Sequence, residues 1–360
     1  MKFIDKIKMI KTYLPMFWFY FRYLFKKSKP LFGAFFQITN KCNARCLMCF
    51  NWQILNESKD ELSLGQIDRF SKTMGLVPSL TIGGGEPFLR DDLPQICEIF
   101  CKNNKTKRIS IPTNSLLSDK IMDLTEKILN ICSSTKIAIT LSLDGVGAIH
   151  DAIRGVEGAF ERFLETYNKI SQLLVRYPNL KININTTVSD KNYNNISQVI
   201  DFVDKNLKVG FHTIEIIRGC YNQKNVQAIS TDEYRGLIRK ILLSRTINND
   251  KYHKLIYSYY HGLSLKTIEK KKRLIPCRAS SFMPVIDAKG DVYNCELLPA
   301  IGNLRDYEYD VFKILNSQKS KIQRKDIFQK KCHCTHYCYQ VQNIPMSPSH
   351  FLRAICGKNL

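Results

Sequence analysis

The stretch FFQITNKCNARCLMCF, residues 35–50, runs from a short apolar segment into three cysteines placed within eight positions. Phe35–Thr39 is strand-like, and Cys42, Cys46 and Cys49 follow it on one tight loop. A closed structural zinc site or a fully ligated iron–sulfur cluster normally takes four protein ligands. Three thiols without a fourth nearby therefore indicate a cluster with one open position, with a zinc knuckle or redox thiols as the alternatives.

Beyond residue 32 the chain alternates short apolar runs with longer amphipathic runs. In the amphipathic runs the apolar residues recur every three or four positions, as at Ile121, Leu124 and Ile128. The predicted strands are Phe35–Thr39, Leu80–Gly83, Arg108–Thr113, Lys136–Ser142, Lys181–Val188 and His212–Ile217. The predicted helices cover 62–75, 91–103, 118–132, 158–176, 192–206 and 231–243, with Ser63 and Ser118 as N-caps. This alternation predicts an α/β fold with a parallel sheet, and six units predict a partial (β/α)6 TIM-like barrel.

A polar motif follows each of the six predicted strands. The cysteine loop comes first, followed by GGGEP (83–87), TNS (113–115), SLDG (142–145), TTVSD (186–190) and RGC (218–220). In barrels of parallel strands the chemistry lies at the carboxyl ends of the strands. We therefore expect these motifs to converge on one rim and to form a site there.

The spacing Cys42-x3-Cys46-x2-Cys49, with the aromatic Phe50 directly after it, resembles the radical S-adenosylmethionine (SAM) superfamily. The resemblance covers about residues 33–220 and implies that the three thiolates bind three irons of a 4Fe–4S cluster. SAM would chelate the fourth iron and would be cleaved to methionine and a 5′-deoxyadenosyl radical after electron transfer. The cofactor would thus carry the chemistry, while the protein positions and shields the radical.

The same resemblance extends to residues that would hold SAM. Gly83, Gly84, Gly85, Glu86 and Pro87 match the glycine-rich motif of the family, in which glycines allow close backbone approach and a carboxylate can accept from an ammonium group. Asn114, Ser142, Asp144 and Arg154 resemble positions that reach the ribose and carboxylate of SAM. Asn, Ser and Asp are also ordinary turn residues at strand ends. Cys220, on the predicted rim, is a candidate hydrogen-atom donor or ligand.

A second group of cysteines lies near the C-terminus. Cys277 and Cys295 flank an apolar–polar alternation around DAKGD that predicts a β-hairpin, and CHCTHYC follows at 332–338. This arrangement resembles the SPASM/twitch extension of radical SAM enzymes, which implies auxiliary iron–sulfur clusters. The six available cysteines are Cys277, Cys295, Cys332, Cys334, Cys338 and Cys356. Two all-cysteine cubes would need eight, so the economical interpretation is one auxiliary 4Fe–4S cluster on Cys277, Cys295 and two of Cys332, Cys334 and Cys338. A second cluster with an open site or a His333 or His336 ligand, and a structural zinc site, are alternatives.

The net charge and the number of cysteines indicate which partners and which cellular compartment suit the protein. The chain has 54 Lys and Arg against 32 Asp and Glu, a net charge of +22, which predicts attraction to polyanions or reflects solvated lysines. The run Lys270–Arg273 is expected to be a solvated helix end or loop, and Cys97, Cys101 and Cys132 to be buried packing residues. Thirteen cysteines without a secretory signal favour metal-bound or free thiols in a reducing cytoplasm.

The first 31 residues form a basic, aromatic-rich amphipathic segment. Pro15 and Arg22 interrupt its apolar run, which is too short to span a bilayer. Such a segment suits the inner face of an anionic membrane, or else packs its aromatics on the main domain. We expect the chain to divide into 1–31, a barrel at 32–245, a helical linker at 246–276 and the auxiliary domain at 277–360.

The substrate is not identified by the sequence. A peptide and a membrane-associated or surface-glycan precursor are the candidates, with a flavodoxin or ferredoxin as reductant. Only about 30 residues precede the barrel, below the ~40 that a self-standing leader-binding domain needs, which weakens the peptide interpretation. The alternatives are an RNA-modifying radical SAM enzyme or a non-catalytic basic metal-binding protein. No RNA-binding module is recognisable, so nucleic acid is the less favoured partner.

Overall fold

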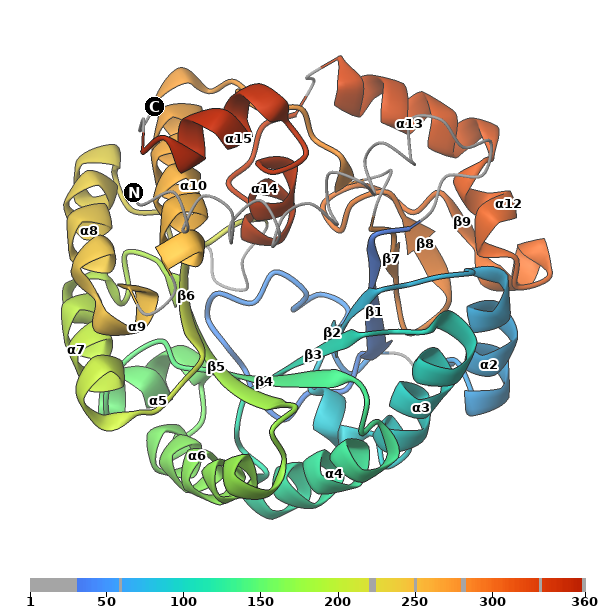
Figure 1. Cartoon of the computed structure of the whole chain (residues 1–360), viewed down its shortest axis with the longest axis horizontal. Helices are drawn as coiled ribbons and strands as arrows, with labels where there is room; N and C mark the ends of the chain where they lie inside the picture. The colour runs from blue at the N-terminus through green and yellow to red at the C-terminus, as the bar shows by residue number, and fades with distance from the viewer. Residues whose placement is uncertain are drawn as a thin grey trace.

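The structure is a computed structural model that describes residues 31–57, 60–219, 225–248, 251–279, 283–329 and 332–357. Figure 1 shows an arc of strands with helices along its outer side, and with α10 (Lys251–Lys270), α14 (Tyr337–Asn343) and α15 (Pro348–Ile355) on the side where the arc is open. The predicted partial barrel is confirmed. Among the described residues, no helix has the length and apolar content needed to cross a bilayer.

Six parallel strands form the barrel. They are β1 (Gly33–Thr39), β2 (Ser79–Gly84), β3 (Arg108–Thr113), β4 (Lys136–Ser142), β5 (Leu180–Val188) and β6 (Phe211–Ile216). Each strand pairs with the next one along the chain, so the order from β1 to β6 is sequential. All six predicted strands are present, with ends that shift by at most two residues. Their carboxyl ends therefore share one rim, as right-handed crossovers require.

The helices between the strands are α2 (Leu64–Thr73), α3 (Leu93–Asn104), α4 (Ser118–Ile131), α6 (Ala159–Arg176), α7 (Ile196–Asn206) and α8 (Thr231–Leu243). They agree with the predicted ranges, because each carries one apolar stripe that packs on the sheet. The short elements η1 (Pro87–Leu89) and α5 (Ala148–Arg154) were not predicted, and the 3-10 turn η2 (Tyr193–Asn195) occupies the start of the range 192–206 predicted as one helix. After α8 come α9 (Arg245–Asn248) and the long α10 (Lys251–Lys270).

The predicted hairpin is confirmed as β7 (Val285–Ile286) and β8 (Asp291–Tyr293), which pair antiparallel, and β9 (Gly302–Asn303) pairs with β8. The sequence did not indicate that this hairpin continues the barrel sheet. Phe35 and Phe36 of β1 pair in parallel with Val285 and Ile286 of β7, which extends the sheet to nine strands. The C-terminal region continues with η3 (Leu304–Tyr307), α12 (Val311–Leu315), α13 (Gln318–Phe328), α14 (Tyr337–Asn343) and α15 (Pro348–Ile355).

The two predicted N-caps have different outcomes. Ser63 caps α2 in a capping box, in which its hydroxyl accepts from the Gln66 N–H while Gln66 Oε1 accepts from the Ser63 N–H. The prediction for Ser118 was wrong, because Leu117 occupies the N-cap position of α4 without a side-chain bond. Ser118 is already the first helical residue, and its hydroxyl accepts instead from Lys169 Nζ at 3.5 Å.

The prediction of a fully solvated Lys270–Arg273 run was also wrong at its last residue. Lys270, Lys271 and Lys272 are exposed, but Arg273 is buried. Its guanidinium donates to the carbonyls of Ile327 and Phe328 at the end of α13, where unpaired carbonyls favour a cation. The expectation for the helical cysteines is confirmed for Cys97 and Cys132, which are buried, while Cys101 is half-buried. Cys101 lies 3.3 Å from the Thr135 hydroxyl.

Candidate active site

The cysteine loop leaves the carboxyl end of β1 and is fixed by backbone bonds on both sides. Cys42 exchanges two hydrogen bonds with the side chain of Asn56, at 2.9 and 3.1 Å. Farther along, the Arg45 and Leu47 N–H groups donate to the carbonyls of Arg154 and Ile153 at the end of α5. The shape of the loop is therefore set by hydrogen bonds to its own far end and to α5.

The three thiols of the loop are half-buried and influence one another. Burial raises the pKa of Cys42, and the neighbouring Cys46 raises it further. Burial likewise raises the pKa of Cys49 to about 12, again with a contribution from Cys46. Metal binding requires deprotonated thiols, so iron would have to displace protons here. Three soft sulfur ligands on one loop fit an iron–sulfur cluster.

The glycine-rich segment at the end of β2 packs directly against the cysteine loop. Gly84 has φ +114°, and a Cβ there would lie 2.3 Å from the Thr39 carbonyl oxygen. The Gly85 N–H donates to the same oxygen at 2.7 Å, and a Cβ at Gly85 would lie 2.1 Å from the Lys41 carbonyl oxygen. Both positions thus require glycine. A Cβ at Gly83 would make only ordinary contact, at 3.9 Å from Pro112.

Glu86 ties this segment to β3. Its buried carboxylate accepts from the Thr113 hydroxyl at 2.9 Å, the Asn114 N–H at 2.7 Å and the Phe88 N–H at 3.2 Å. Burial raises the pKa of Glu86 to about 7, against the opposing effect of these bonds. A carboxylate has about four acceptor positions, so roughly one is left for a ligand. Pro87 begins the 3-10 turn η1 that follows.

Asp144 and Arg154 meet as a buried ion pair, 2.7 Å apart. Asp144 also accepts from the Thr187 N–H at 2.8 Å, and Arg154 Nη1 points to the Cys46 sulfur at 3.6 Å. Burial lowers the pKa of Arg154, but Asp144 and Cys46 outweigh it, so the net pKa is raised and the guanidinium stays charged. Arg154 is thus a fixed cation beside the thiols.

The other predicted contacts of SAM lie on the same rim. Asn114 donates to Asn43 at 2.7 Å and points to the Cys42 sulfur at 3.9 Å, whereas Ser142 is the half-buried last residue of β4. Both polar side-chain atoms of the buried Asn40 lack a partner in the described part of the chain, as does Arg154 Nε. Buried polar atoms without partners are rare, and here they leave hydrogen-bonding capacity for a polar ligand beside the thiols. Cys220 lies outside the described residues.

A buried charge network that the sequence did not indicate lies across the rim from these residues. Arg218, just after β6, contacts Glu215 at 2.5 Å and Glu296 at 3.2 Å, and His336 also contacts Glu296. Burial would raise the pKa of Glu296, but His336 and Arg218 prevail and lower it to about 2. The Arg218 guanidinium also lies over the ring of Phe50, 5.4 Å from its centre. Only the RGC motif, and the position of Glu296 next to Cys295, could have pointed to this network.

The C-terminal cysteines do not share one environment. Burial is the main cause that raises the pKa of Cys277, Cys295 and Cys334, and neighbouring thiols add to it. Cys332 acts on Cys277 and Cys334, while Glu296, Cys334 and Cys277 act on Cys295. The half-buried Cys338 lies instead beside Glu215, Arg218 and Glu296, and desolvation raises its pKa to about 12. Cys356 is exposed after α15. In the described residues no three Cys, His, Asp or Glu side chains meet at the distances of a single-ion site.

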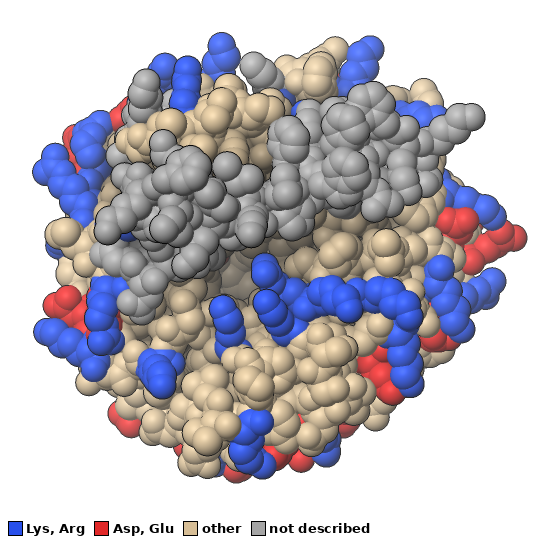
Figure 2. Space-filling view, viewed as in Figure 1, with Lys and Arg blue, Asp and Glu red and all other residues tan. Residues whose placement is uncertain are grey.

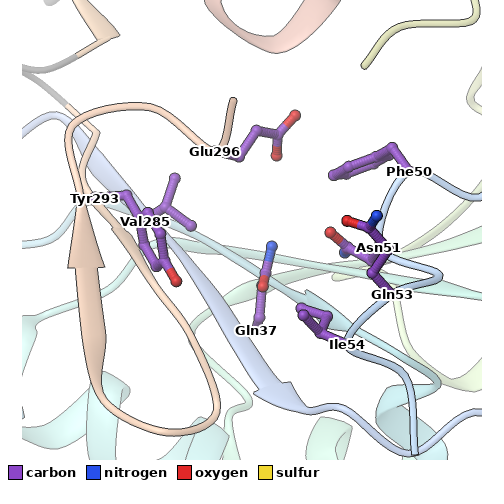
Figure 3. A pocket seen from close by; sticks show the side chains of 8 residues that line it. All are labelled: Gln37, Phe50, Asn51, Gln53, Ile54, Val285, Tyr293 and Glu296. Atoms are coloured by element: carbon purple, nitrogen blue, oxygen red, sulfur yellow. The ribbon is translucent and has the colours of Figure 1, made fainter. Parts of the chain in front are cut away.

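A cavity of about 190 Å³ lies between the two groups of cysteines. Its lining combines the residues that follow Cys49 with the hairpin and the residue after Cys295. Figure 3 shows Gln37 of β1 and Glu296 extending toward one another across this cavity. The complete lining is Gln37, Phe50, Asn51, Gln53, Ile54, Val285, Tyr293 and Glu296.

The rim therefore combines three thiols on one loop with buried polar atoms that lack partners, beside a cavity, and these features suit an iron–sulfur cluster and a polar ligand. Residues 36–203 match the model of the Radical SAM superfamily. The matched range contains the cysteine loop, the glycine-rich segment and strands β2 to β5, so over this part of the barrel the chain is similar to radical SAM proteins.

Two relatives show how far the similarity in sequence extends. The chain is 23% identical over 291 residues to the AdoMet-dependent heme synthase of Methanosarcina barkeri, covering 76% of this chain and 79% of that protein. It is 26% identical over 184 residues to the Fe-coproporphyrin III synthase of the same organism. That match covers 50% of this chain and only 42% of the relative.

The fold is also found in solved structures. The structure of anSMEcpe with bound AdoMet and Cp18Cys peptide superimposes with a TM-score of 0.59 and 17% identity. The match covers 91% of this chain and 99% of anSMEcpe. The similarity therefore includes the C-terminal region as well as the barrel.

Proposed function

We propose that this enzyme holds a SAM-binding 4Fe–4S cluster on Cys42, Cys46 and Cys49 and modifies a substrate bound in the adjoining cavity. When bound and reduced, such a cluster supplies the electron that cleaves SAM to methionine and a 5′-deoxyadenosyl radical, which then abstracts a substrate hydrogen atom. The observation that carries the proposal is the loop of three thiols, backed by two obligatory glycines and the fixed Arg154 cation. No fourth thiol is placed among these groups in the described residues.

The side chains around the loop have separable tasks in this proposal. Gly84 and Gly85 let the backbone of β2 lie against the loop, while Arg154 stabilises thiolate charge beside Cys46. The remaining acceptor position of Glu86 and the free amide of Asn40 would bind polar groups of SAM. Phe50, which follows Cys49, lines the cavity and contacts Arg218, and would limit the access of water to a radical.

We assign one auxiliary 4Fe–4S cluster to Cys277, Cys295, Cys332 and Cys334. The electrostatic proximity of these thiols supports this choice over one that includes Cys338, which lies among charged side chains. Arg273, whose guanidinium reaches to 3.9 Å from the Cys332 sulfur, would stabilise a thiolate there.

The test is an iron and zinc count on anaerobically reconstituted protein. Two 4Fe–4S clusters would give about eight irons per chain, and Cys277→Ala combined with Cys332→Ala would leave about four. Cys356→Ala is the matched control and should retain the full amount. Zinc in place of iron, or about four irons in the unaltered chain, would contradict the auxiliary cluster. A count unchanged by the double substitution would contradict the ligand set.

For the substrate, we infer a peptide or a membrane-associated precursor such as that of a surface glycan. The peptide alternative is supported by the fold shared with anSMEcpe, whose structure contains a peptide. The membrane alternative depends on the basic aromatic segment at 1–30, which lies outside the described residues. Flotation with anionic liposomes of the full chain and of a chain that begins at residue 31 separates the two. Equal binding by both would exclude a membrane role for the segment.

The electron would come from a small reductant such as a flavodoxin or ferredoxin, proteins that are typically acidic. Figure 2 shows Lys and Arg side chains spread over much of one face of the enzyme, which suits an acidic partner. RNA modification is the alternative that the net charge of +22 leaves open. A salt-dependent mobility shift with generic RNA would favour it.

A further inference from the structure

The cavity between the two groups of cysteines carries hydrogen-bonding capacity that the protein itself does not use. The side-chain amides of Gln37, Asn51 and Gln53 line it, and none has a hydrogen-bond partner within the described residues. Side chains that line a cavity without partners are available to a ligand, and an amide can both donate and accept. Three amides in the cavity wall are suited to hydroxyl, amide or ammonium groups.

Glu296 adds a directed negative charge to the cavity wall, on the side that faces Gln37. Its contacts with Arg218 and His336 all involve Oε1, and within the described residues its other carboxylate oxygen has no partner. The Glu296 side chain is 8% exposed, so the small part of it that remains accessible faces the cavity it lines. Figure 3 shows this carboxylate above the amide of Gln37. A hydrogen-bond donor placed between the two would be held from both sides.

The charge balance of the wall disfavours an anion. No lysine or arginine lines the cavity in the described part of the chain. The nearest guanidinium, that of Arg218, is already shared between two carboxylates, Glu215 and Glu296. An anionic group that entered would lose its water and find no free cation, and it would approach Glu296 directly. The wall is therefore neutral to negative as a binding surface.

The size of the cavity limits the group that it accepts. A volume of about 190 Å³ is below the ~300–1,000 Å³ typical of pockets that enclose a whole drug-sized ligand. One amino-acid side chain or one sugar ring fits this space, while the rest of a larger substrate would lie outside. Trp52 and Leu297, each a neighbour in sequence of residues that line the cavity, are exposed at 37% and 38% and would offer apolar contact to that remainder.

We propose that the cavity selects an uncharged or positively charged hydrogen-bond donor of the substrate, and that Glu296 is the residue that determines this specificity. The proposal rests on the proposed function, since it assumes that the substrate enters between the two clusters. It excludes polycarboxylates and phosphates as the reacting group. One relative is named Fe-coproporphyrin III synthase. Coproporphyrin III carries four carboxylates, so we expect it to bind poorly to this cavity.

The test measures binding rather than turnover, so that it does not depend on radical chemistry. Saturation-transfer NMR on the reconstituted, SAM-loaded full chain would compare ethanolamine with glycolate, which are similar in size and opposite in charge. We expect ethanolamine to bind at least ~10-fold more tightly than glycolate, and coproporphyrin III not to compete with it. Glu296→Gln should reduce this preference to below ~2-fold, whereas the exposed control Glu161→Gln should leave it unchanged.

A second variant and two further probes complete the design. Gln37→Leu should weaken ethanolamine binding without creating a preference for glycolate, and iron content shows whether each variant is folded. Acetyl-Gly-Lys-Gly-amide and glucosamine then distinguish a peptide from a sugar as the source of the group. Equal or tighter binding of glycolate, no detectable binding of ethanolamine, or an unchanged preference in folded Glu296→Gln would overturn the proposal. A lack of SAM cleavage with the charge preference intact would instead refute only the proposed radical function.

Discussion

At the scale of single residues, the geometry of the thiol loop depends on glycines whose side-chain space is filled by the loop itself. Gly85→Ala would place a Cβ 2.1 Å from the Lys41 carbonyl oxygen, so the loop would have to move by more than an ångström. We expect this variant to lose most of the iron bound at the loop, about four per chain, and the formation of 5′-deoxyadenosine with it.

The matched control is Gly65→Ala on α2, where no atom lies within 4 Å of the added Cβ. It should retain its iron and gain slightly in stability, because alanine is the better helix former. Iron content and thermal unfolding measure both variants. Full iron loading in Gly85→Ala would show that the loop is less constrained than the contacts indicate.

Glu86 makes the stability of the folded protein depend on pH, and the burial of its carboxyl group determines the direction of that dependence. Its pKa is about 7 in the folded chain and 4.5 as an ordinary glutamate, so between these values the folded state holds a proton that the unfolded state has released. The stabilisation that protonated Glu86 contributes to the folded state is fully present below pH 4.5, and it is lost as the pH rises through 7. Glu86→Gln removes the titration. The free energy of unfolding of the iron-free wild type, relative to the variant, should fall by up to about 3 kcal/mol between pH 4.5 and 8.

Urea unfolding at a series of pH values measures this difference, with the exposed Glu157→Gln as control. A constant difference between wild type and Glu86→Gln would mean that the carboxylate is charged throughout. The sequence predicted Glu86 as a site residue from its motif. It could not predict that Thr113, Asn114 and Phe88 already donate hydrogen bonds to most of the acceptor positions of the carboxylate. Those contacts depend on the relative positions of the carboxyl ends of β2 and β3.

At the scale of elements, Arg273 links the end of α10 to the end of α13. Arg273→Met would leave the carbonyls of Ile327 and Phe328 without their cation, at a cost of about 2 kcal/mol in unfolding free energy. Lys272→Met is the matched control one residue away, and because Lys272 is exposed it should change stability by less than about 0.5 kcal/mol. Equal effects of the two substitutions in chemical unfolding would contradict the link.

The elements themselves were largely predictable, and the exceptions have a common cause. The six strands and the six helices between them carry strong apolar periodicity, which the sheet and its helical layer require. Arg273 and Ser118 were misassigned because their roles depend on partners distant in sequence, α13 and Lys169 respectively. The network of Glu215, Arg218 and Glu296 was missed for the same reason, because Arg218 and Glu296 lie 78 positions apart in the sequence.

At the scale of the whole molecule, the C-terminal region completes the barrel sheet. β7 pairs with β1, so its removal would expose the backbone edge of β1 and the side chain of Phe35, which would lose its contacts with the cluster of Met283 and Tyr339. A chain ended after Pro276 should therefore aggregate or lose cooperative thermal unfolding. A truncated chain that unfolds cooperatively and keeps its loop iron would show that the barrel is independent. The domain limits drawn from the sequence remain predictions until then.

The central claim is that three cysteines on one loop bind a cluster that cleaves SAM. The most direct measurement is the yield of 5′-deoxyadenosine from reconstituted, dithionite-reduced protein with SAM, compared between the wild type and Cys46→Ala. We predict 5′-deoxyadenosine from the wild type and none from Cys46→Ala, while the variant keeps the ~4 irons of its auxiliary cluster. No 5′-deoxyadenosine from the fully loaded wild type, or an equal yield from Cys46→Ala, would contradict the account.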